Sequence, residues 1–600
     1  MVGVESLVSD DAGRDIGWHA GADYTRAPSS PQRVIRRELR AAVLPSRDVN
    51  AAKLLLHASL AGTYGSLYLA FFLRAANRGA EAPGFVALLP VVIVYALVAG
   101  IVWSLLYGLL RFFARHRLRL VWFSLRYVLP FHAVNSAVII GACWSTVSRY
   151  RRVFEPDTAA RLELACGGAA LAWLIAAVVS IVPALRRSSW SPMSAAGLAL
   201  IALFLPLDVG APEPGRAYAP GDRRPLSAPP RHTLIVLNFD GADLEDVLTL
   251  VSQGKLPALS RMREEGAHGR LQSQEPCVAA VARTTLVSGK LPYRHGVRGS
   301  FERRLLGAEP PISVVPPGIG FDSLLGPLQQ RHRLSLVDRS SLALWEMLEL
   351  LGGSSVAAGW EIDFDGDDAT AGDTESGTMS QARVRELLGL PLAGPTGRVV
   401  GDRIDDLKNA LQADERVAAR LNAVGDGDHP ELIALSFPGL DQIAHAYLRY
   451  ARPGEFGNVT REEIERYGPV LEGYYRYVDS IIGRVLDTWG DQATLFVTSS
   501  HGMAPIAVLD RLLASVSGGG SLTGSHEEAP GGLLFARGPD ILAGHAFGRG
   551  SIGDVVPTAL YALGRPVARD LDGRIRTGIF SSRHTERYAV TVIDSYEALR

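Results

Sequence analysis

Long apolar stretches dominate the chain between residues 51 and 209. They occupy residues 54–73, 85–110, 127–147, 164–185 and 191–208. A helix needs about 20 predominantly apolar residues to cross the ~30 Å hydrocarbon core of a bilayer. The second and fourth stretches meet this length without a charge, whereas the third carries His132 and Asn135 and the fifth is short. The pattern predicts a transmembrane region of about five helices, and it disfavours a buried bundle in a soluble protein.

Arginine is distributed unevenly between the segments that flank these stretches. Residues 1–50 form a polar tail that is rich in arginine. Residues 111–126 and the turn before the fifth stretch are also rich in arginine. Residues 74–84 and 148–163 instead mix arginine with acidic residues. Positively charged loops stay on the cytoplasmic side of a membrane. With five crossings, this asymmetry places the tail in the cytoplasm and residues 231–600 outside it.

A proline-rich segment at residues 210–230 follows the apolar region and contains six prolines. Proline fixes the backbone and stiffens a linker into an extended spacer. We therefore expect a linker that holds the domain at residues 231–600 away from the bilayer.

Short apolar stretches, each followed by a polar cluster, recur in this second domain. Leu234–Leu237 precedes Asp240, and helical patterns follow it. The stretch ELIALSF precedes Asp441 and His445, and ATLFV precedes His501. This alternation is typical of a doubly wound α/β domain, in which ligands bind at the carboxyl ends of the strands.

Carboxylate and imidazole groups therefore gather where a ligand is expected. His526, in a glycine-flanked loop, adds a further imidazole. Such donors suit zinc, or manganese where more oxygens take part.

Composition excludes several classes of protein. A formal net charge of −1 argues against a general polyanion binder, so no nucleic acid polymer is expected as a partner. Hydrophobic residues make up 47% of the chain and charged residues 20%, which excludes disorder as the main state. Three cysteines exclude a disulfide scaffold.

Five segments of the second domain occur in an order that is known from one protein family. They are LNFDGAD, PCVAAVARTTLVSGKLPYRHGV, LDQIAHAY, VTSSHGM, and GSHEEAPGGLLFARGPDI with the following SIGDVVPTALYALGRPVARDLDGR. Together they resemble the motifs of the type I phosphodiesterase/nucleotide pyrophosphatase branch of the alkaline phosphatase superfamily, over about residues 231–580. The resemblance implies an alkaline-phosphatase-like fold and a hydrolase that acts on phosphoric esters with two metal ions.

The resemblance also assigns metal ligands. It implies that Asp441, His445 and His526 bind one ion; we call these three residues the first half-site. It implies that Asp240 and His501 bind the other ion together with a second aspartate and the nucleophile. We call Asp240, His501 and the positions of those two groups the second half-site.

The sequence departs from the family pattern at both of these remaining positions. The family's VTSDHG motif reads VTSSHG here, so Ser500 stands at the position of a metal-binding carboxylate. Counting from Pro276 and from Gly289 places Ala279 at the nucleophile position, and alanine has no oxygen to attack phosphorus. Two remaining ligands are too few for a tight zinc site. We therefore predict one zinc ion per chain. We expect Ser500→Asp alone to let a second ion begin to bind, and Ser500→Asp with Ala279→Thr to raise phosphodiesterase activity over wild type by at least ~100-fold.

Three functions remain open. The first is a membrane-anchored phosphodiesterase or phosphotransferase, weakly active or using a single metal, that acts outside the cytoplasm on a nucleotide, a lipid headgroup or an envelope glycan. The second is a catalytically inactive binding or regulatory protein with such a phosphorylated molecule as its ligand. The third is a membrane protein whose helices do the work, although the apolar stretches contain almost no acidic residues for an ion pathway. In all three the lipid bilayer is a partner.

Overall fold

The computed structural model describes most of the chain. The described residues are 51–78, 82–114, 128–181, 202, 204–208, 232–275, 277–360, 379–390, 404–424, 429–457, 459–506, 523–526 and 529–600. The tail at residues 1–50, most of the fifth apolar stretch and the proline-rich segment at residues 210–230 lie outside them.

Four long helices coincide with the first four apolar stretches. They are α2 (Ala51–Ala76), α3 (Phe85–Ala114), α4 (Val128–Arg149) and α5 (Pro156–Ile181). Among the described residues, two windows are long and apolar enough to cross a membrane by length and composition, Phe85–Leu106 and Pro156–Ile175. The prediction of five spanning helices is therefore not confirmed. Helices α2 and α4 carry internal polar residues such as Ser66 and Thr146, whose hydroxyls donate to carbonyls of their own helices at 2.9 and 2.7 Å.

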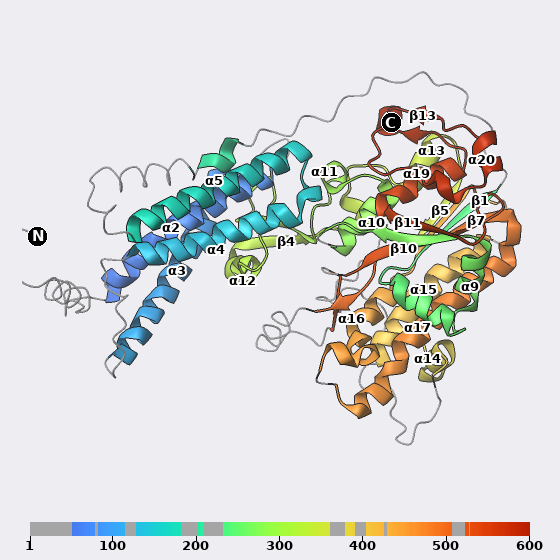
Figure 1. Cartoon of the computed structure of the whole chain (residues 1–600), viewed down its shortest axis with the longest axis horizontal. Helices are drawn as coiled ribbons and strands as arrows, with labels where there is room; N and C mark the ends of the chain where they lie inside the picture. Colours follow the sequence, from blue (N-terminus) through green and yellow to red (C-terminus); the bar gives the residue numbers. More distant parts are fainter. Residues whose placement is uncertain are drawn as a thin grey trace, which may run out of the picture.

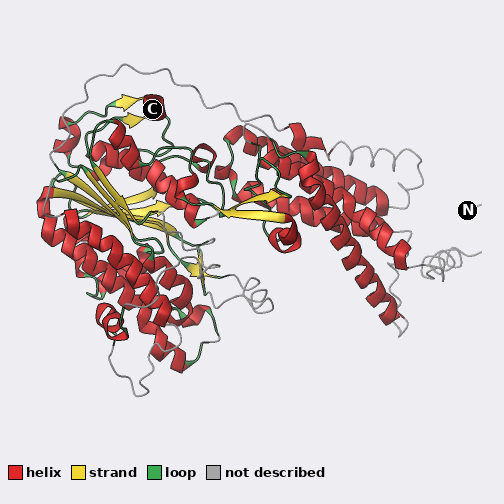
Figure 2. Cartoon of the chain, turned by 180° about the vertical axis from the view of Figure 1, so that it is seen from behind, coloured by secondary structure: helices red, strands yellow, loops and turns green. Residues whose placement is uncertain are grey.

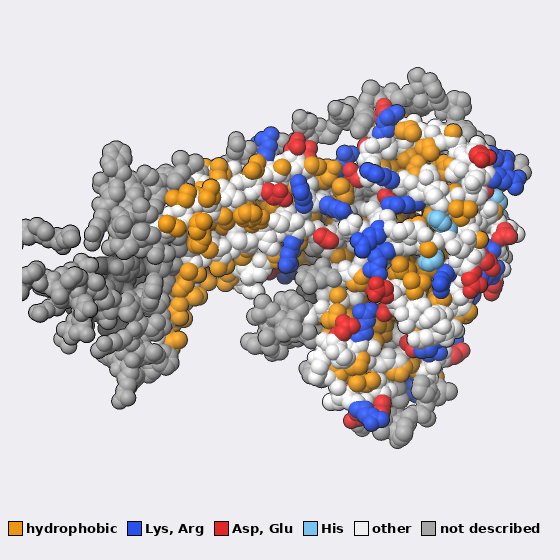
Figure 3. Space-filling model, viewed as in Figure 1, with side chains coloured by type: hydrophobic (Ala, Val, Ile, Leu, Met, Phe, Trp, Pro, Cys, Tyr) orange, Lys and Arg blue, Asp and Glu red, His pale blue; other side chains and the backbone are white. Residues whose placement is uncertain are grey.

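The outer surface of these helices is apolar. Most of the exposed large hydrophobic side chains of the described residues lie on them, including Leu105 (68% exposed) and Leu164 (76% exposed). Figure 3 shows the corresponding hydrophobic surface along the helical part of the molecule. Contiguous exposed apolar surface of this kind marks an interaction with a membrane or a protein.

The second domain is built on a seven-stranded mixed sheet. In spatial order its strands are β11 (His545–Ser551), β2 (Ala267–Gln272), β10 (Gly531–Arg537), β7 (Ala493–His501), β1 (Thr233–Asn238), β6 (Leu432–Ser436) and β5 (Ser355–Ala358). Strands β7, β1, β6 and β5 are parallel, as the sequence predicts. Strand β10 runs antiparallel to both of its neighbours, so the predicted doubly wound domain has a mixed rather than a wholly parallel sheet.

Helices cover both faces of the sheet (Figures 1 and 2). One face packs against α8 (Leu244–Ser252), α9 (Pro257–Glu265), α14 (Gln381–Leu388), α15 (Ile404–Val424), α16 (Gly439–Ala451) and α17 (Arg461–Trp489). The other face packs against α10 (Ala279–Ser288), α13 (Leu344–Leu350) and α19 (Val555–Ala562). Alternation along β1 produces these two cores, because Ile235 and Leu237 lie in the first and Leu234 and Val236 in the second.

Smaller elements complete the domain. They are α11 (Pro292–His295), β3 (Phe301–Leu305), α12 (Phe321–Leu325), β4 (Gln329–Arg333), β8 (Ala504–Pro505), β9 (Gly524–Ser525), β12 (Val567–Ala568), α20 (Ser582–Arg587) and β13 (Val592–Ile593).

The β3–β4 hairpin and α12 connect the second domain directly to helices α2–α5. In Figure 1 they lie between these helices and the sheet of the domain. Apolar residues of β3 and α12 share one buried cluster with α2, α3, α4 and α5. The Asn77 side chain accepts the backbone N–H groups of Ser313 and Val314 at 2.8 and 2.7 Å, and the Tyr95 hydroxyl donates to the carbonyl of Ile319 at 2.9 Å. The second domain therefore packs directly against α2–α5, and the predicted linker at residues 210–230 lies outside the described residues.

Candidate functional site

The three parallel strands at the centre of the sheet bring the predicted residues to one edge. Asp240 follows β1, His501 ends β7, and Asp441 and His445 lie in α16, which follows β6. Gly241 permits the close approach of the loop after β1 to α16. Its φ is +82°, and a Cβ added there would lie 2.8 Å from the Cα of Asp441. A side chain at this position would separate the two half-sites.

His526 reaches the same edge from the loop at residues 523–526. Its ring centroid lies 5.2 Å from that of His445 and 5.0 Å from that of His501. All five predicted metal ligands are buried, with Asp240 and Asp441 nearly inaccessible to solvent. The structure thus brings the whole predicted set together. As the described side chains stand, no three His, Cys, Asp or Glu residues are close enough to hold a metal ion.

The three histidines share a hydrogen-bond pattern that favours metal binding. The Nδ1 atoms of His445, His501 and His526 lie 2.8, 3.1 and 2.6 Å from the backbone carbonyls of Gly524, Gly502 and Cys277. A carbonyl only accepts hydrogen bonds, so each Nδ1 carries the proton and each Nε2 offers a lone pair. This outer hydrogen bond is the usual means by which proteins fix the tautomer of a metal-binding histidine.

The first half-site contains a buried carboxylate without hydrogen bonds. Neither oxygen of Asp441 has a hydrogen-bond partner among the described residues. The Nε2 atom of His445 lies 3.8 Å from Oδ1 of Asp441. Ligands about 2.0 Å from a tetrahedral zinc ion lie about 3.3 Å apart, so a small closing movement would suffice. The donor set of one carboxylate and two imidazoles therefore fits zinc.

In the second half-site the Asp240 carboxylate is already saturated by hydrogen bonds, whereas Nε2 of His501 has no hydrogen-bond partner among the described residues. Oδ1 of Asp240 accepts the backbone N–H and the hydroxyl of Ser500, at 2.8 and 2.6 Å. Oδ2 accepts Nε of Arg283 at 2.7 Å. Burial by itself raises the pKa of Asp240, but the Arg283 guanidinium, His501 and the Ser500 hydrogen bonds hold that pKa well below its usual value. Asp240 is therefore a fully paired carboxylate.

The nucleophile position provides no reactive oxygen. Ala279 is the first residue of α10 and is completely buried. The nearby hydroxyls are engaged elsewhere, because Thr284 donates to the carbonyl of Ala280 at 2.7 Å and Thr285 contacts Nε2 of His295 at 3.0 Å. Cys277 is buried with its Sγ 3.2 Å from the hydroxyl of Ser273. None of these contacts indicates a relocated nucleophile.

Two functional residues escape sequence reasoning. Arg283 is the only charged residue in α10, whose ten residues are all buried. The sequence shows this single charge, but it does not show that the whole helix is buried. Asp414 lies in α15 and supports the start of α16. Its carboxylate accepts hydrogen bonds from the N–H of Gly439 at 3.0 Å and from the hydroxyl of Tyr474 at 2.8 Å. Burial raises the pKa of Asp414 to about 7. Its position in an ordinary amphipathic helix gives no sign of this role.

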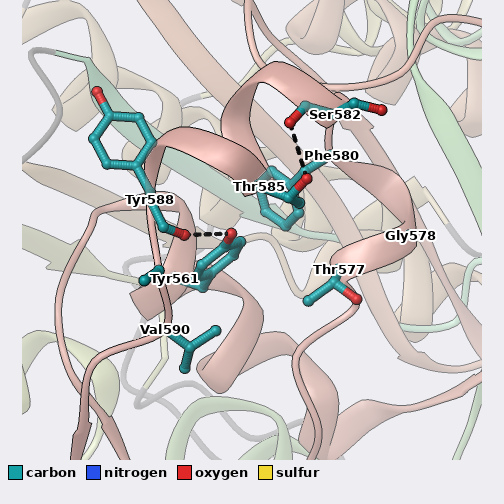
Figure 4. Close-up of a pocket in the computed structure, with 9 residues that line it drawn as sticks. Tyr561, Thr577, Gly578, Phe580, Ser582, Thr585, Tyr588 and Val590 are labelled. Atoms are coloured by element: carbon teal, nitrogen blue, oxygen red, sulfur yellow. Dashed lines mark hydrogen bonds between the residues drawn. The ribbon is translucent and has the colours of Figure 1, made fainter.

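A pocket near the C-terminus is separate from this chemistry. It has a volume of about 420 Å³ and lies between α19 and α20 (Figure 4). Its rim is tied by a hydrogen bond from the Tyr561 hydroxyl to the carbonyl of Tyr588, at 2.9 Å. No charged side chain lines it. Its lining therefore supplies no cation to neutralise a phosphate.

Comparison with known proteins supports the resemblance drawn from the motifs. A family model described as type I phosphodiesterase / nucleotide pyrophosphatase matches residues 234–517. This range includes both positions that depart from the motifs, and it ends before His526. No curated protein matches the chain significantly.

Among solved structures, murine ectonucleotide pyrophosphatase / phosphodiesterase 5 is similar at 13% identity and a TM-score of 0.34. An inactive variant of the murine protein in complex with AMP gives 14% and 0.35, and the human protein gives 12% and 0.35. Each comparison covers 58% of this chain and 100% of the other. TM-scores this low do not establish a common fold. The family-model match is thus the comparison that bears on the site, and it shows similarity to phosphodiesterases/nucleotide pyrophosphatases.

Proposed function

We propose that this chain is a membrane-anchored relative of the type I phosphodiesterases/nucleotide pyrophosphatases that binds a phosphoric ester through one zinc ion. We further propose that it forms no covalent phosphoryl-enzyme. The observation that carries the proposal is the contrast within the site. Asp441 is a buried carboxylate without a hydrogen-bond partner among the described residues and lies 3.8 Å from Nε2 of His445, whereas the nucleophile position is Ala279. A buried charge needs a counter-charge, and a divalent cation would supply it.

The residues around this carboxylate suit a phosphate group. When bound, zinc would supply positive charge for a phosphate oxygen and lower the pKa of a bound water. The carbonyls of Gly524 and Cys277 orient the imidazoles of His445 and His526. The side chain of Val278 does not cap α10, so the N-terminus of this helix adds partial positive charge nearby.

Slow hydrolysis is a second candidate function. Three protein ligands leave one position of a tetrahedral zinc ion for water, as in many zinc hydrolases. Such a reaction would proceed without an intermediate bound to the protein, because Ala279 has no oxygen. The two candidates therefore share the metal and differ only in turnover.

The membrane topology predicted from arginine has support in the contacts of the loops. Asn77, just after α2, bonds to Val314 of the second domain. The 3-10 turn Arg151–Val153, between α4 and α5, contacts α11 of the same domain. Both turns therefore lie at the end of the helices that faces the second domain. This arrangement is expected if the α2–α3 connection, the α4–α5 connection and residues 231–600 are all extracytoplasmic. The described helices account for only part of the five crossings that this proposal needs.

Metal analysis of the purified full chain tests the first half-site. We expect about one zinc per chain in the wild type and none in His445→Ala, with zinc-dependent binding of AMP lost in parallel. His268→Ala, a half-buried histidine on β2 outside the cluster, should keep its zinc. Retention of zinc by His445→Ala would refute the assignment, and so would a phosphoryl or nucleotidyl adduct trapped on the wild type.

Labelling of an engineered cysteine tests the topology separately. A cysteine placed at Arg600 should react with a membrane-impermeant maleimide in intact cells. Reaction only after the membrane is permeabilised would invert the topology.

A further inference from the structure

The second half-site contains an arginine where a second metal ion would be expected. The side chains of Arg283 and Asp240 are 3% and 1% exposed, and their Nε and Oδ2 atoms are 2.7 Å apart. Ala279 begins α10 and Arg283 follows one helical turn later, so the two positions lie on the same face of the helix. The small side chain at position 279 and the guanidinium at position 283 thus belong to one local arrangement.

The charges of this half-site balance without a metal. In the family pattern, two carboxylates, at positions 240 and 500, face a divalent cation. Here Ser500 removes one negative charge, and the Arg283 guanidinium neutralises the remaining one. A buried ion pair is stable only when its remaining hydrogen-bonding capacity is met, and the N–H and hydroxyl of Ser500 satisfy Oδ1 of Asp240.

We infer that Arg283 takes the place of the second metal ion, so that the site combines one divalent cation with one permanent guanidinium. A further divalent cation at Asp240 would be repelled by Arg283 and would find two ligands, Asp240 and His501. The inference rests on the proposed zinc at the first half-site only for the total number of ions. The exclusion of metal from Asp240 depends on Arg283 and Ser500, and it does not depend on the first half-site.

The experiment compares zinc binding between four forms of the full chain. The wild type and Ser500→Asp should each bind zinc at the first half-site only. Arg283→Met with Ser500→Asp should bind one additional zinc, because the two carboxylates and His501 now lack a competing cation. We expect the affinity for this additional ion to rise by at least ~100-fold over the wild type.

Arg565→Met with Ser500→Asp is the matched control. Arg565 forms a buried pair with Glu431 whose side chains are 10% and 12% exposed, away from the site. The control should lose folding stability because it breaks a buried ion pair, as Arg283→Met does, but it should bind no additional zinc. A gain of zinc in this control would show that Ser500→Asp alone, rather than the loss of Arg283, opens the second half-site, and it would overturn the inference.

Two other results would also overturn it. One is a wild type with a zinc ion at Asp240, seen as anomalous scattering at the zinc edge, a measurement that depends on no variant. The other is a folded Arg283→Met/Ser500→Asp chain that gains no zinc. If the wild type binds no zinc at all, the proposed function fails, whereas a zinc gained only by the Arg283→Met variant still supports the role of Arg283.

Discussion

The two half-sites contain similar residue types, but the aspartate of each half-site has a different set of hydrogen-bond and charge partners. In the first, the Asp441 carboxylate is buried without a hydrogen bond among the described residues, and His445 lies 3.8 Å away. In the second, Asp240 has three hydrogen bonds and a cationic partner. The carboxylate of the first half-site therefore lacks a counter-charge, whereas the carboxylate of the second half-site is paired without a metal ion.

Under the proposed function, the difference is that charge compensates for a missing metal ligand. Removing a carboxylate from a two-metal site and leaving the rest would leave a single buried aspartate without a partner, which is strongly unfavourable. Arg283 provides that partner. The departures at positions 279 and 500 and the ion pair of Arg283 with Asp240 are then parts of one arrangement, in which a carboxylate is salt-bridged rather than metal-bound.

The largest expected effect is on folding stability, and substituting the two aspartates should change it in different directions. In the metal-free full chain, Asp240→Asn should destabilise by about 3–5 kcal/mol, because it leaves the Arg283 guanidinium buried without a counter-charge. Asp441→Asn should leave the stability unchanged or raise it, since it removes a buried carboxylate that lacks hydrogen bonds. Thermal unfolding in detergent with EDTA measures both. A stronger loss for Asp441→Asn would reverse the comparison.

The next effect is a change in catalytic rate when the family's residues are restored at positions 279 and 500 and the charge of Arg283 is removed. We expect Ala279→Thr, Ser500→Asp and Arg283→Met together to raise phosphodiesterase activity over wild type by at least ~100-fold, or about 2.7 kcal/mol of barrier. The double change Ala279→Thr/Ser500→Asp, which seemed sufficient from the sequence, should give much less while Arg283 excludes the ion. Turnover of bis-p-nitrophenyl phosphate with zinc present measures this. Equal rates for the double and triple variants would show that Arg283 does not compete with metal.

The order of strands at the centre of the domain could be anticipated from the sequence. Apolar stretches before Asp240, Asp441 and His501 indicated strands, and all three pair in parallel at one edge of the sheet. The antiparallel strand β10 could not be anticipated, because strand direction depends on long-range pairing rather than on local pattern. The same holds for the packing of Val314 against the membrane-region helices, which involves residues 237 positions apart in the chain.

The composition of the site was predictable, but its electrostatics were not. Motif spacing singled out five residues that lie buried and close together, and it singled out Ala279 and Ser500 as departures. Arg283 was overlooked because a single arginine in a helix is ordinarily a surface residue, and only the burial of all of α10 reveals its partner. The sequence therefore predicted which groups were missing and not what replaced them.

The smallest effect concerns the support of the first half-site, and it depends on pH. Asp414, which holds the N-terminus of α16 through Gly439, has its pKa raised by burial to about 7, well above the ordinary value for aspartate. The folded chain therefore retains this proton between about pH 4 and 7, where the unfolded chain has lost it. Stability from this group should fall as pH rises through that window, by at most about 1.4 kcal/mol per unit.

Asp414→Asn should remove this component of the pH dependence and leave the variant more stable than wild type at pH 8. Tyr474→Phe is the control, because it removes the hydroxyl that donates to Asp414 but keeps the carboxyl group, so the decline with pH should persist. Melting temperatures of the three forms in EDTA at pH 5, 6, 7 and 8 measure the effect. An Asp414→Asn chain that declines as steeply as wild type would show that Asp414 is ionised throughout. The N-terminus of α16, and with it Asp441, would then carry two buried negative charges, and the first half-site would need its cation still more strongly.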